Sequence, residues 1–199
     1  INSEPQPRPI SLPDINWYPS RPETNGRVVF FYFFHPYMLR SMAESMPDID
    51  LWQRQLGRDV VVVGVITNFD NFGGVQIPDK QKTPEYLKEQ MEKYGKSRNF
   101  DHYFVCDPDR ATINAVLATD TFEIPLPFYA IASSDNLVRW WSHPRAPRAL
   151  ASLEKIIKVD PGVKIRREAE EAWRKSHAPS AAPATTPEST ASTPATSGT

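Results

Sequence analysis

Two uninterrupted apolar runs stand out along the chain, at residues 28–34 and 60–66. A strand with one face in water alternates polar and apolar residues, whereas runs like these are typical of strands buried on both faces. Between them, over residues 37–56, apolar residues recur every three or four positions, which predicts a helix. Pro47 inside this segment predicts a kink or a restart of the helix, and Gly57 a stop.

The alternation of strands and helices continues through the rest of the chain. Its predicted elements are, in order, a helix opened by Thr83-Pro84 and ended by Gly95, a strand at 102–106, a short helix at 111–118, a hairpin of strands 128–132 and 137–141, and helices at 146–158 and 160–175. Strand–helix–strand units imply parallel pairing, and the late hairpin adds antiparallel strands. The pattern therefore predicts an α/β fold in which helices cover both faces of a mixed sheet, with an extra C-terminal helix.

The two ends of the chain differ in composition from its middle. Half of the 20 prolines lie in these two ends, at residues 1–24 and 178–199. We expect an extended N-terminal arm at 1–24, which Trp17 and Tyr18 anchor, a domain at 25–158 and a C-terminal helix at 159–177. The segment 178–199 is almost entirely Ala, Thr, Ser and Pro, and it lacks the large apolar residues whose burial offsets the entropy of ordering a chain. We predict a disordered tail there.

Charge and hydropathy exclude two classes of function. The net charge is -1 and no block of Lys or Arg is present, so the electrostatic basis for nucleic-acid binding is missing. No stretch of about 18 apolar residues is present, so the sequence predicts no transmembrane segment. The segment 67–82 is long and polar for a simple connection, and ordered loops of this length are often functional.

A resemblance enters at residues 34–48, which read FHPYMLRSMAESMPD. This stretch aligns without a gap with the FWATWCxxCRAEMPD pattern of the TlpA-like thioredoxins, an extracytoplasmic group of thiol-disulfide oxidoreductases. Pro47 matches the family's helix-kinking proline. Leu39 and Met42 stand where the family has its two redox cysteines.

A second match lies at residues 123–131, which read EIPLPFYAI. Here Pro125 resembles the family's proline that follows a cis peptide bond, and residues 140–144, WWSHP, resemble a WxGHP turn of one branch. The resemblance covers about residues 10–158 and implies a thioredoxin-like fold.

The reaction of the family is not implied in the same way. Family members attack a disulfide with a thiolate at a helix N-terminus, and a second cysteine resolves the mixed disulfide. A leucine and a methionine at positions 39 and 42 can perform neither step. The single cysteine, Cys106, lies in a predicted central strand and is interpreted as a small buried apolar residue. We therefore favour a protein that is not an enzyme, with a thiol oxidoreductase that uses Cys106 or a partner's cysteines as the alternative.

The retained scaffold predicts a binding role. Thioredoxins hold an extended peptide beside the cis-proline, where it pairs as an added strand. Ile124 and Pro125 can preserve this pairing, and the apolar contacts would come from Tyr37, Met38, Leu39 and Phe128. We expect Met38 to be the most exposed of the helix methionines. The predicted partner is a protein or an extended peptide, and a second alternative is a structural subunit of a larger complex, including one associated with a membrane.

Histidine and aspartate spacing predicts neither a metal site nor a cofactor. His35, His143 and a methionine are the residues that could hold copper, but no His-x-His or Cys/His spacing supports such a site. His102 and His177 have no evident partner in the sequence. Turn or cap roles are expected for Asp107, Asp109 and Asp120.

Three features of the chain bear on the location of the protein. The family that it resembles is usually extracytoplasmic, that is, periplasmic or secreted. A chain that starts at Ile1 fits either removal of an export signal or trimming of the N-terminus. The Ala, Thr, Ser and Pro tail fits an extracytoplasmic stalk or a linker. We expect an extracytoplasmic protein.

Overall fold

A computed structural model of the chain describes residues 7–14, 16–72, 74–117, 126–142 and 147–178. Its strands are β1 (Arg8–Pro9), β2 (Trp17–Tyr18), β3 (Val28–Phe34), β4 (Val60–Thr67), β5 (Asn71–Phe72), β6 (Val75–Gln76), β7 (Tyr103–Asp107), β8 (Phe128–Ala132) and β9 (Leu137–Ser142). Its α-helices are α1 (Leu39–Leu56), α2 (Pro84–Arg98), α3 (Ala111–Leu117), α4 (Pro147–Val159) and α5 (Pro161–Ser176). Two short 3-10 helices, η1 (Pro36–Met38) and η2 (Asp79–Gln81), precede α1 and α2.

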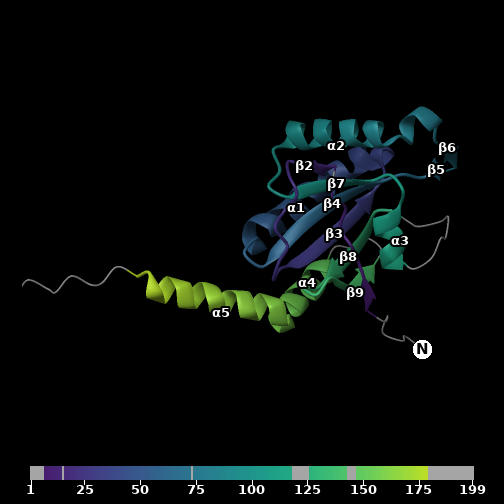
Figure 1. The fold of residues 1–199 in the computed structure, drawn as a ribbon. Helices are drawn as coiled ribbons and strands as arrows, with labels where there is room; N and C mark the ends of the chain where they lie inside the picture. Colours follow the sequence, from purple (N-terminus) through teal and green to yellow (C-terminus); the bar gives the residue numbers. More distant parts are fainter. Residues whose placement is uncertain (1–6, 15, 73, 118–125, 143–146, 179–199) are drawn as a thin grey trace, which may run out of the picture.

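Seven strands form the main sheet, in the order β1-β9-β8-β3-β4-β7-β2 (Figure 1). The central strands β3, β4 and β7 are parallel, and β8 and β9 form antiparallel pairs beside them. Every residue of β3 and β4 is buried, as their uninterrupted apolar sequences predict. The N-terminal arm supplies both edge strands, since β1 pairs with β9 and β2 with β7.

Two hydrophobic clusters cover the two faces of the sheet. Val28, Phe30, Tyr32 and Phe34 face a cluster built with α1, α2 and α4. The alternate residues of β3 face a second cluster, formed with α3 and with arm residues such as Ile10. Helices therefore cover both faces, and the predicted α/β arrangement is confirmed.

Two helices differ from the prediction. Helix α2 does not stop at Gly95 but runs on to Arg98, and Asn99 ends it with a left-handed φ of 51°. Gly95 has a different role, because a Cβ there would lie 2.5 Å from the ring of Tyr18. Helix α1 continues through Pro47 without a restart. The sequence placed a stop at Gly95 because glycine often ends a helix, but here glycine lets the arm pack against the helix.

The C-terminal helix α5 begins at a firm anchor. The side chain of Asp160 accepts hydrogen bonds from the amide of Val163 (2.9 Å) and from the amide of Ser134 (2.8 Å). Asp59, just before β4, accepts bonds from Arg166 and Arg167 of α5. Beyond these contacts the helix extends away from the body of the domain (Figure 1).

The predicted domain boundaries at 24, 158 and 177 stay predictions, and residues 179–199 of the predicted tail lie outside the described part of the chain. The long segment 67–82 contains the hairpin β5–β6 and η2.

Candidate functional site

The turn between β3 and α1 is the position that carries redox chemistry in the family that the sequence resembles. The amide of Met38 donates to the carbonyl of His35 (2.8 Å), which closes the η1 turn. The amide of Tyr37 donates to Nδ1 of His35 (3.2 Å). Met38 occupies the cap position of α1 and makes no side-chain cap bond. The turn therefore presents the start of a helix, with Leu39 as its first residue.

No thiol lies at this turn. Met42 is only 2% exposed and packs in the core with Met46. Met38 is the most exposed of the helix methionines, as predicted, but at 7% it is still buried and packs in the same core. Leu39 begins α1, and its side chain lies outside the described part. A thioether cannot exchange with a disulfide, so Met42 cannot act as a resolving group.

A row of side chains runs across this end of the sheet, and we call it the aromatic row: Tyr37, His35, Phe69 and Arg110. Tyr37 is 42% exposed, and its hydroxyl donates to Oε1 of Gln81 in η2. The rings of His35 and Tyr37 meet edge to face at 5.0 Å, and His35 lies 6.1 Å from Phe69. The guanidinium of Arg110 lies 4.8 Å from the centre of the ring of Phe69. This cation–π geometry holds a positive charge beside an aromatic surface.

This end of the sheet combines a neutral histidine, His35, with one cation, Arg110, and one buried carboxyl group, Asp107. Burial lowers the pKa of His35 to about 4, so its imidazole is neutral near pH 7. Asp107 is buried, and its carboxylate accepts bonds from the amides of Thr112 and Ile113 (3.1 Å each) at the start of α3. Burial raises the pKa of Asp107, and these amides oppose that rise. The predicted cap role of Asp107 is confirmed.

Arg110 keeps unused hydrogen-bonding capacity. Its Nε and Nη2 atoms are buried and have no hydrogen-bond partner within the part of the chain that the structure describes. Its backbone has a positive φ of 60°, at the turn that follows β7. Two directed donors on a fixed guanidinium suit a carboxylate or a backbone carbonyl.

Cys106 lies away from this row, in β7. It is 2% exposed, and its Sγ lies 3.7 Å from Sδ of Met91 in α2. Burial raises the pKa of the thiol to about 12. Because the thiolate is the nucleophilic form of cysteine, burial and a raised pKa both disfavour reaction of Cys106 at neutral pH.

Of the remaining predicted binding residues, Phe128 is described by the structure, whereas Ile124 and Pro125 are not. Phe128 is buried and packs against Phe33 across the β3–β8 pair. Ile124 and Pro125 lie outside the described residues, so the predicted cis bond before Pro125 stays a prediction. A cis peptide bond is present at Leu126–Pro127, directly before β8.

His102 has partners that the sequence did not reveal, which corrects our expectation. Its Nδ1 lies 2.6 Å from Oδ1 of Asp50, and its Nε2 lies 2.5 Å from the hydroxyl of Tyr32. Arg54 pairs with the other oxygen of Asp50 (3.0 Å). All of Tyr32, Asp50 and His102 are buried, so no nucleophile of this group can meet a substrate. The Tyr32–His102–Asp50 network is therefore structural.

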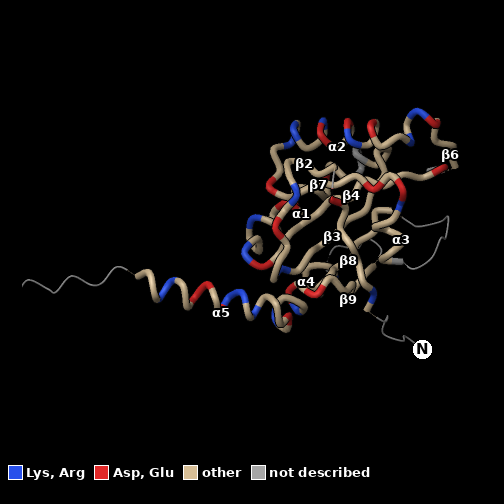
Figure 2. Tube along the Cα trace, viewed as in Figure 1, with Lys and Arg blue, Asp and Glu red and all other residues tan. Residues whose placement is uncertain are grey.

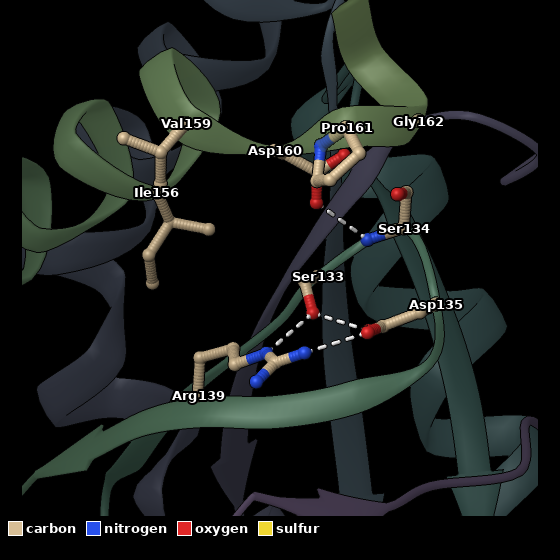
Figure 3. A pocket seen from close by; sticks show the side chains of 9 residues that line it. All are labelled: Ser133, Ser134, Asp135, Arg139, Ile156, Val159, Asp160, Pro161 and Gly162. Carbon is tan, nitrogen blue, oxygen red and sulfur yellow. Dashed lines mark hydrogen bonds and ion pairs between the residues drawn. The ribbon is translucent and has the colours of Figure 1, made fainter. Parts of the chain in front are cut away.

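A cavity of about 560 Å³ lies between the β8–β9 turn and the junction of α4 and α5 (Figure 3). Its polar side chains bond to one another: Ser133 and Asp135 both accept from Arg139, and Asp160 is bonded to the chain as described above. Its other walls are apolar, with Ile156 and Val159. Because these polar groups hydrogen-bond to one another, they form no arrangement that suggests a catalytic or ligand-binding site. We therefore place the candidate site at the aromatic row.

Metal ligation and membrane insertion have no structural support within the described residues. No group of three or more His, Cys, Asp or Glu side chains is arranged there to hold a metal ion. His143 and Asp120 lie outside those residues. None of the described helices combines the length and the apolar character that crossing a bilayer demands.

Sequence reasoning found Tyr37 and His35 but missed Phe69, Gln81 and Arg110. The length of the segment 67–82 was the signal for Phe69 and Gln81, since long ordered loops often carry function. No signal in the sequence marked Arg110, whose place depends on a positive φ.

Comparison with known proteins agrees with this geometry. No protein-family model and no curated protein matches the chain. Among solved structures, it is similar to a thiol:disulfide interchange protein of Chlorobium tepidum, with a TM-score of 0.54 and 13% identity over 79% of this chain and 99% of that one. It is also similar to a thiol-disulfide isomerase of Corynebacterium glutamicum, with a TM-score of 0.54 and 14% identity over 79% and 98% of the two chains.

A third similar structure is a thioredoxin-like protein in its oxidised form, with a TM-score of 0.51 and 13% identity over 77% of this chain and 95% of that one. Identities this low establish a shared architecture and leave the reaction to be argued from the site. The chain is therefore thioredoxin-like in its fold.

Proposed function

We propose that this thioredoxin-like domain has no thiol chemistry of its own and serves as a binding or assembly component for a protein or an extended peptide. The observation that carries the proposal is the burial of the only thiol. Cys106 is 2% exposed with a pKa raised to about 12, while a buried thioether, Met42, stands at one of the two redox positions. Neither sulfur can form a mixed disulfide with a partner.

The aromatic row supplies the contact surface in this proposal. Tyr37 is exposed at one end and gives apolar area with a polar tip, a combination frequent at interfaces. Arg110 at the other end is half-buried and brings a positive charge beside the ring of Phe69. The chemistry favours a peptide segment that places an apolar side chain on Tyr37 and a carboxylate or carbonyl on Arg110.

A disulfide-reduction assay tests the absence of thiol chemistry. We expect the wild-type chain, with dithiothreitol as reductant, to reduce insulin no faster than dithiothreitol alone, and C106S to behave identically. The variant L39C/M42C is the positive control, because it returns both thiols to the start of α1. Turnover by the wild type that C106S abolishes would establish the oxidoreductase alternative instead.

A peptide selection tests the binding surface. Peptides selected from a randomised library on the wild-type chain should lose affinity about tenfold or more for Y37A and for R110A, a loss typical of central interface residues. R98A is the matched control, since Arg98 also lies over an aromatic ring, that of Tyr94 at 5.5 Å, but on α2. Equal affinity for all three variants would remove the aromatic row from the proposal.

Two finer points belong to the proposal. The first is that the bound peptide is extended and lies beside Pro125, with contacts from Ile124 and Leu39. The side chains of these three residues lie outside the described part of the chain. An extracytoplasmic location is supported by the resemblance to TlpA-like proteins, and fractionation of the native source with antibodies to the chain tests it.

A further inference from the structure

Helix α5 projects from the domain (Figure 1). It has 16 residues, which corresponds to about 24 Å. Its first half is fixed by the bond from the amide of Ser134 to Asp160, drawn in Figure 3, and by Arg166 and Arg167 on Asp59. Those contacts set its direction, and its far half extends beyond the globular body (Figure 1).

The outward face of α5 is apolar. Ile165 is 67% exposed and Trp173 is 64% exposed, and the exposed Ala169 and Ala172 lie between them. Residues 165, 169 and 172 are spaced four and three positions apart, as in the contact face of two packed helices. We call Ile165, Ala169 and Ala172 the seam. Val163, on the other side of the helix, is buried against the domain. The seam therefore faces away from the chain's own core.

We propose that this seam pairs with the same seam of a second copy of the chain, with the two α5 helices antiparallel. In this register Ala169 of one copy lies against Ala172 of the other, and the two-fold symmetry repeats the contact. Small residues at the centre allow a close approach of the helices. The inference goes beyond the proposed function and does not depend on it.

Charge complementarity supports a second copy of the chain as the partner of α5. Glu168 and Lys175 lie seven residues apart on one flank of the seam, so antiparallel pairing sets Glu168 opposite Lys175 of the other copy, twice by symmetry. Glu168 has no ion-pair partner among the described residues, and Lys175 has only an exposed contact to Glu171 at 3.7 Å within that part of the chain. Charges of both signs alternate along α5 in Figure 2, which suits pairing with an identical helix.

The other flank offers a place for Trp173. A hollow of about 490 Å³ lies beside the first half of α5 and is lined by residues that include Gly26, Gly162, Ile165, Arg166 and Ala169. Trp173 and Arg166 occupy the same flank, seven residues apart, and antiparallel pairing brings Trp173 of one copy to Arg166 of the other. In this register Trp173, the largest exposed side chain of α5, therefore reaches the hollow of the other copy.

Sedimentation equilibrium of the full chain over a range of concentrations tests the pairing. The small contact area predicts a weak, concentration-dependent dimer. W173A should abolish it, with helix content unchanged by circular dichroism. E168K and K175E should each raise the dissociation constant about tenfold, and the double variant E168K/K175E should return it close to the wild-type value. K93E on α2 is the control for charge reversal and should leave the dimer unchanged.

Three results would overturn the inference. The first is a wild-type chain that stays monomeric up to about 1 mM, the weakest range worth assigning to such an interface. The second is a dimer that W173A leaves intact. The third is a double charge reversal that fails to restore association.

Discussion

Two histidines are buried to the same degree and yet belong to different kinds of environment. His102 is held on both ring nitrogens, by Asp50 and by Tyr32. His35 accepts a bond from the backbone amide of Tyr37 and lies in an aromatic row that reaches the surface. Burial lowers the pKa of both rings, whereas Asp50 opposes this for His102. One histidine therefore maintains the core, and the other supports a surface.

The network around His102 has a consistent pattern of protons. Burial acts to raise the pKa of Asp50, but the bonds from His102 and from the amide of Asp101 outweigh it, so the carboxylate stays ionised. It then accepts the proton on Nδ1 of His102, which leaves Nε2 to accept from Tyr32. Burial also raises the pKa of Tyr32, so its hydroxyl keeps its proton. Each buried group is satisfied, which is the condition for a polar network in a core.

Removing Asp50 should break this network at the largest cost. D50A leaves the ring of His102 and the amides of Asp101 and His102 without their acceptor. We expect the free energy of unfolding in urea to fall by about 3–5 kcal/mol. D101A is the control, because that side chain is 58% exposed and should change stability by less than about 1 kcal/mol. Similar losses for the two variants would contradict the structural role of the network.

Crowding the hydroxyl of Tyr32 should cost somewhat less. In G64A the new methyl group would lie 2.5 Å from Oη of Tyr32 and 2.9 Å from the ring of Phe104. We expect a loss of about 2–3 kcal/mol, measured by urea unfolding, because a packed core relaxes little. In the double variant Y32F/G64A the hydroxyl contact is gone and the 2.6 Å contact to Cζ of residue 32 remains, so the relief is partial and the combined loss should be somewhat smaller than the sum of the two single losses. Strict additivity would speak against contact between these residues.

Acid should destabilise the protein through His35, and comparison with H35Q separates this effect from that of His102, whose pKa burial also lowers. A histidine with a lowered pKa in the folded state binds protons more readily when the chain is unfolded, so its stabilisation is present above its ordinary pKa of 6.5 and is lost as the pH falls. For His35 the window runs from 6.5 down to about 4. Its contribution is about 2–3 kcal/mol.

The measurement is the free energy of unfolding between pH 7 and pH 4 for the wild type and for H35Q. H35Q should lose stability with a shallower slope, since glutamine does not titrate. The effect of Asp50 lies lower: its lowered pKa gives stability that is lost only as the pH falls below its ordinary value of 3.8. Parallel slopes for the two proteins would refute the assignment to His35.

Altering the exposed end of the aromatic row should have the smallest effect on folding. Y37F removes the bond from the Tyr37 hydroxyl to Gln81, which lies at the surface. We expect the melting temperature to move by no more than a few degrees, corresponding to about 1 kcal/mol or less. A large loss of stability would place Tyr37 with His102 among the residues that hold the core.

The five longer strands and most helices were predictable because their signals are local, whereas the two-residue strands β1, β2, β5 and β6 were not predicted. The runs at 28–34 and 60–66 reappear as β3 and β4, and Thr83-Pro84 opens α2 with the hydroxyl of Thr83 accepting from the amide of Tyr86. Asp160-Pro161 likewise opens α5. Caps and uninterrupted apolar runs depend on neighbours in the sequence, which a single chain reveals.

The parts that escaped prediction depend on residues far apart along the chain. Asp50 and His102 are separated by 52 positions and meet only when β7 is paired in the sheet. Met38 is the most exposed of the helix methionines, as expected, but the sequence did not show that it is still buried in the core. Arg110 reaches Phe69 from a left-handed backbone position after β7. The sequence did not predict this conformation, because position 110 holds neither a glycine nor an asparagine.

The N-terminal arm forms the outermost strand at both borders of the sheet. After pairing with β9, the chain crosses one face of the sheet, where Ile10 and Trp17 pack, and then pairs with β7 at the far border. An open border would present free amides and carbonyls to any extended chain in its surroundings. Because residues 8–9 and 17–18 pair there, each border of the sheet ends in a strand of only two residues, which is a short template for pairing with the strands of a neighbouring molecule.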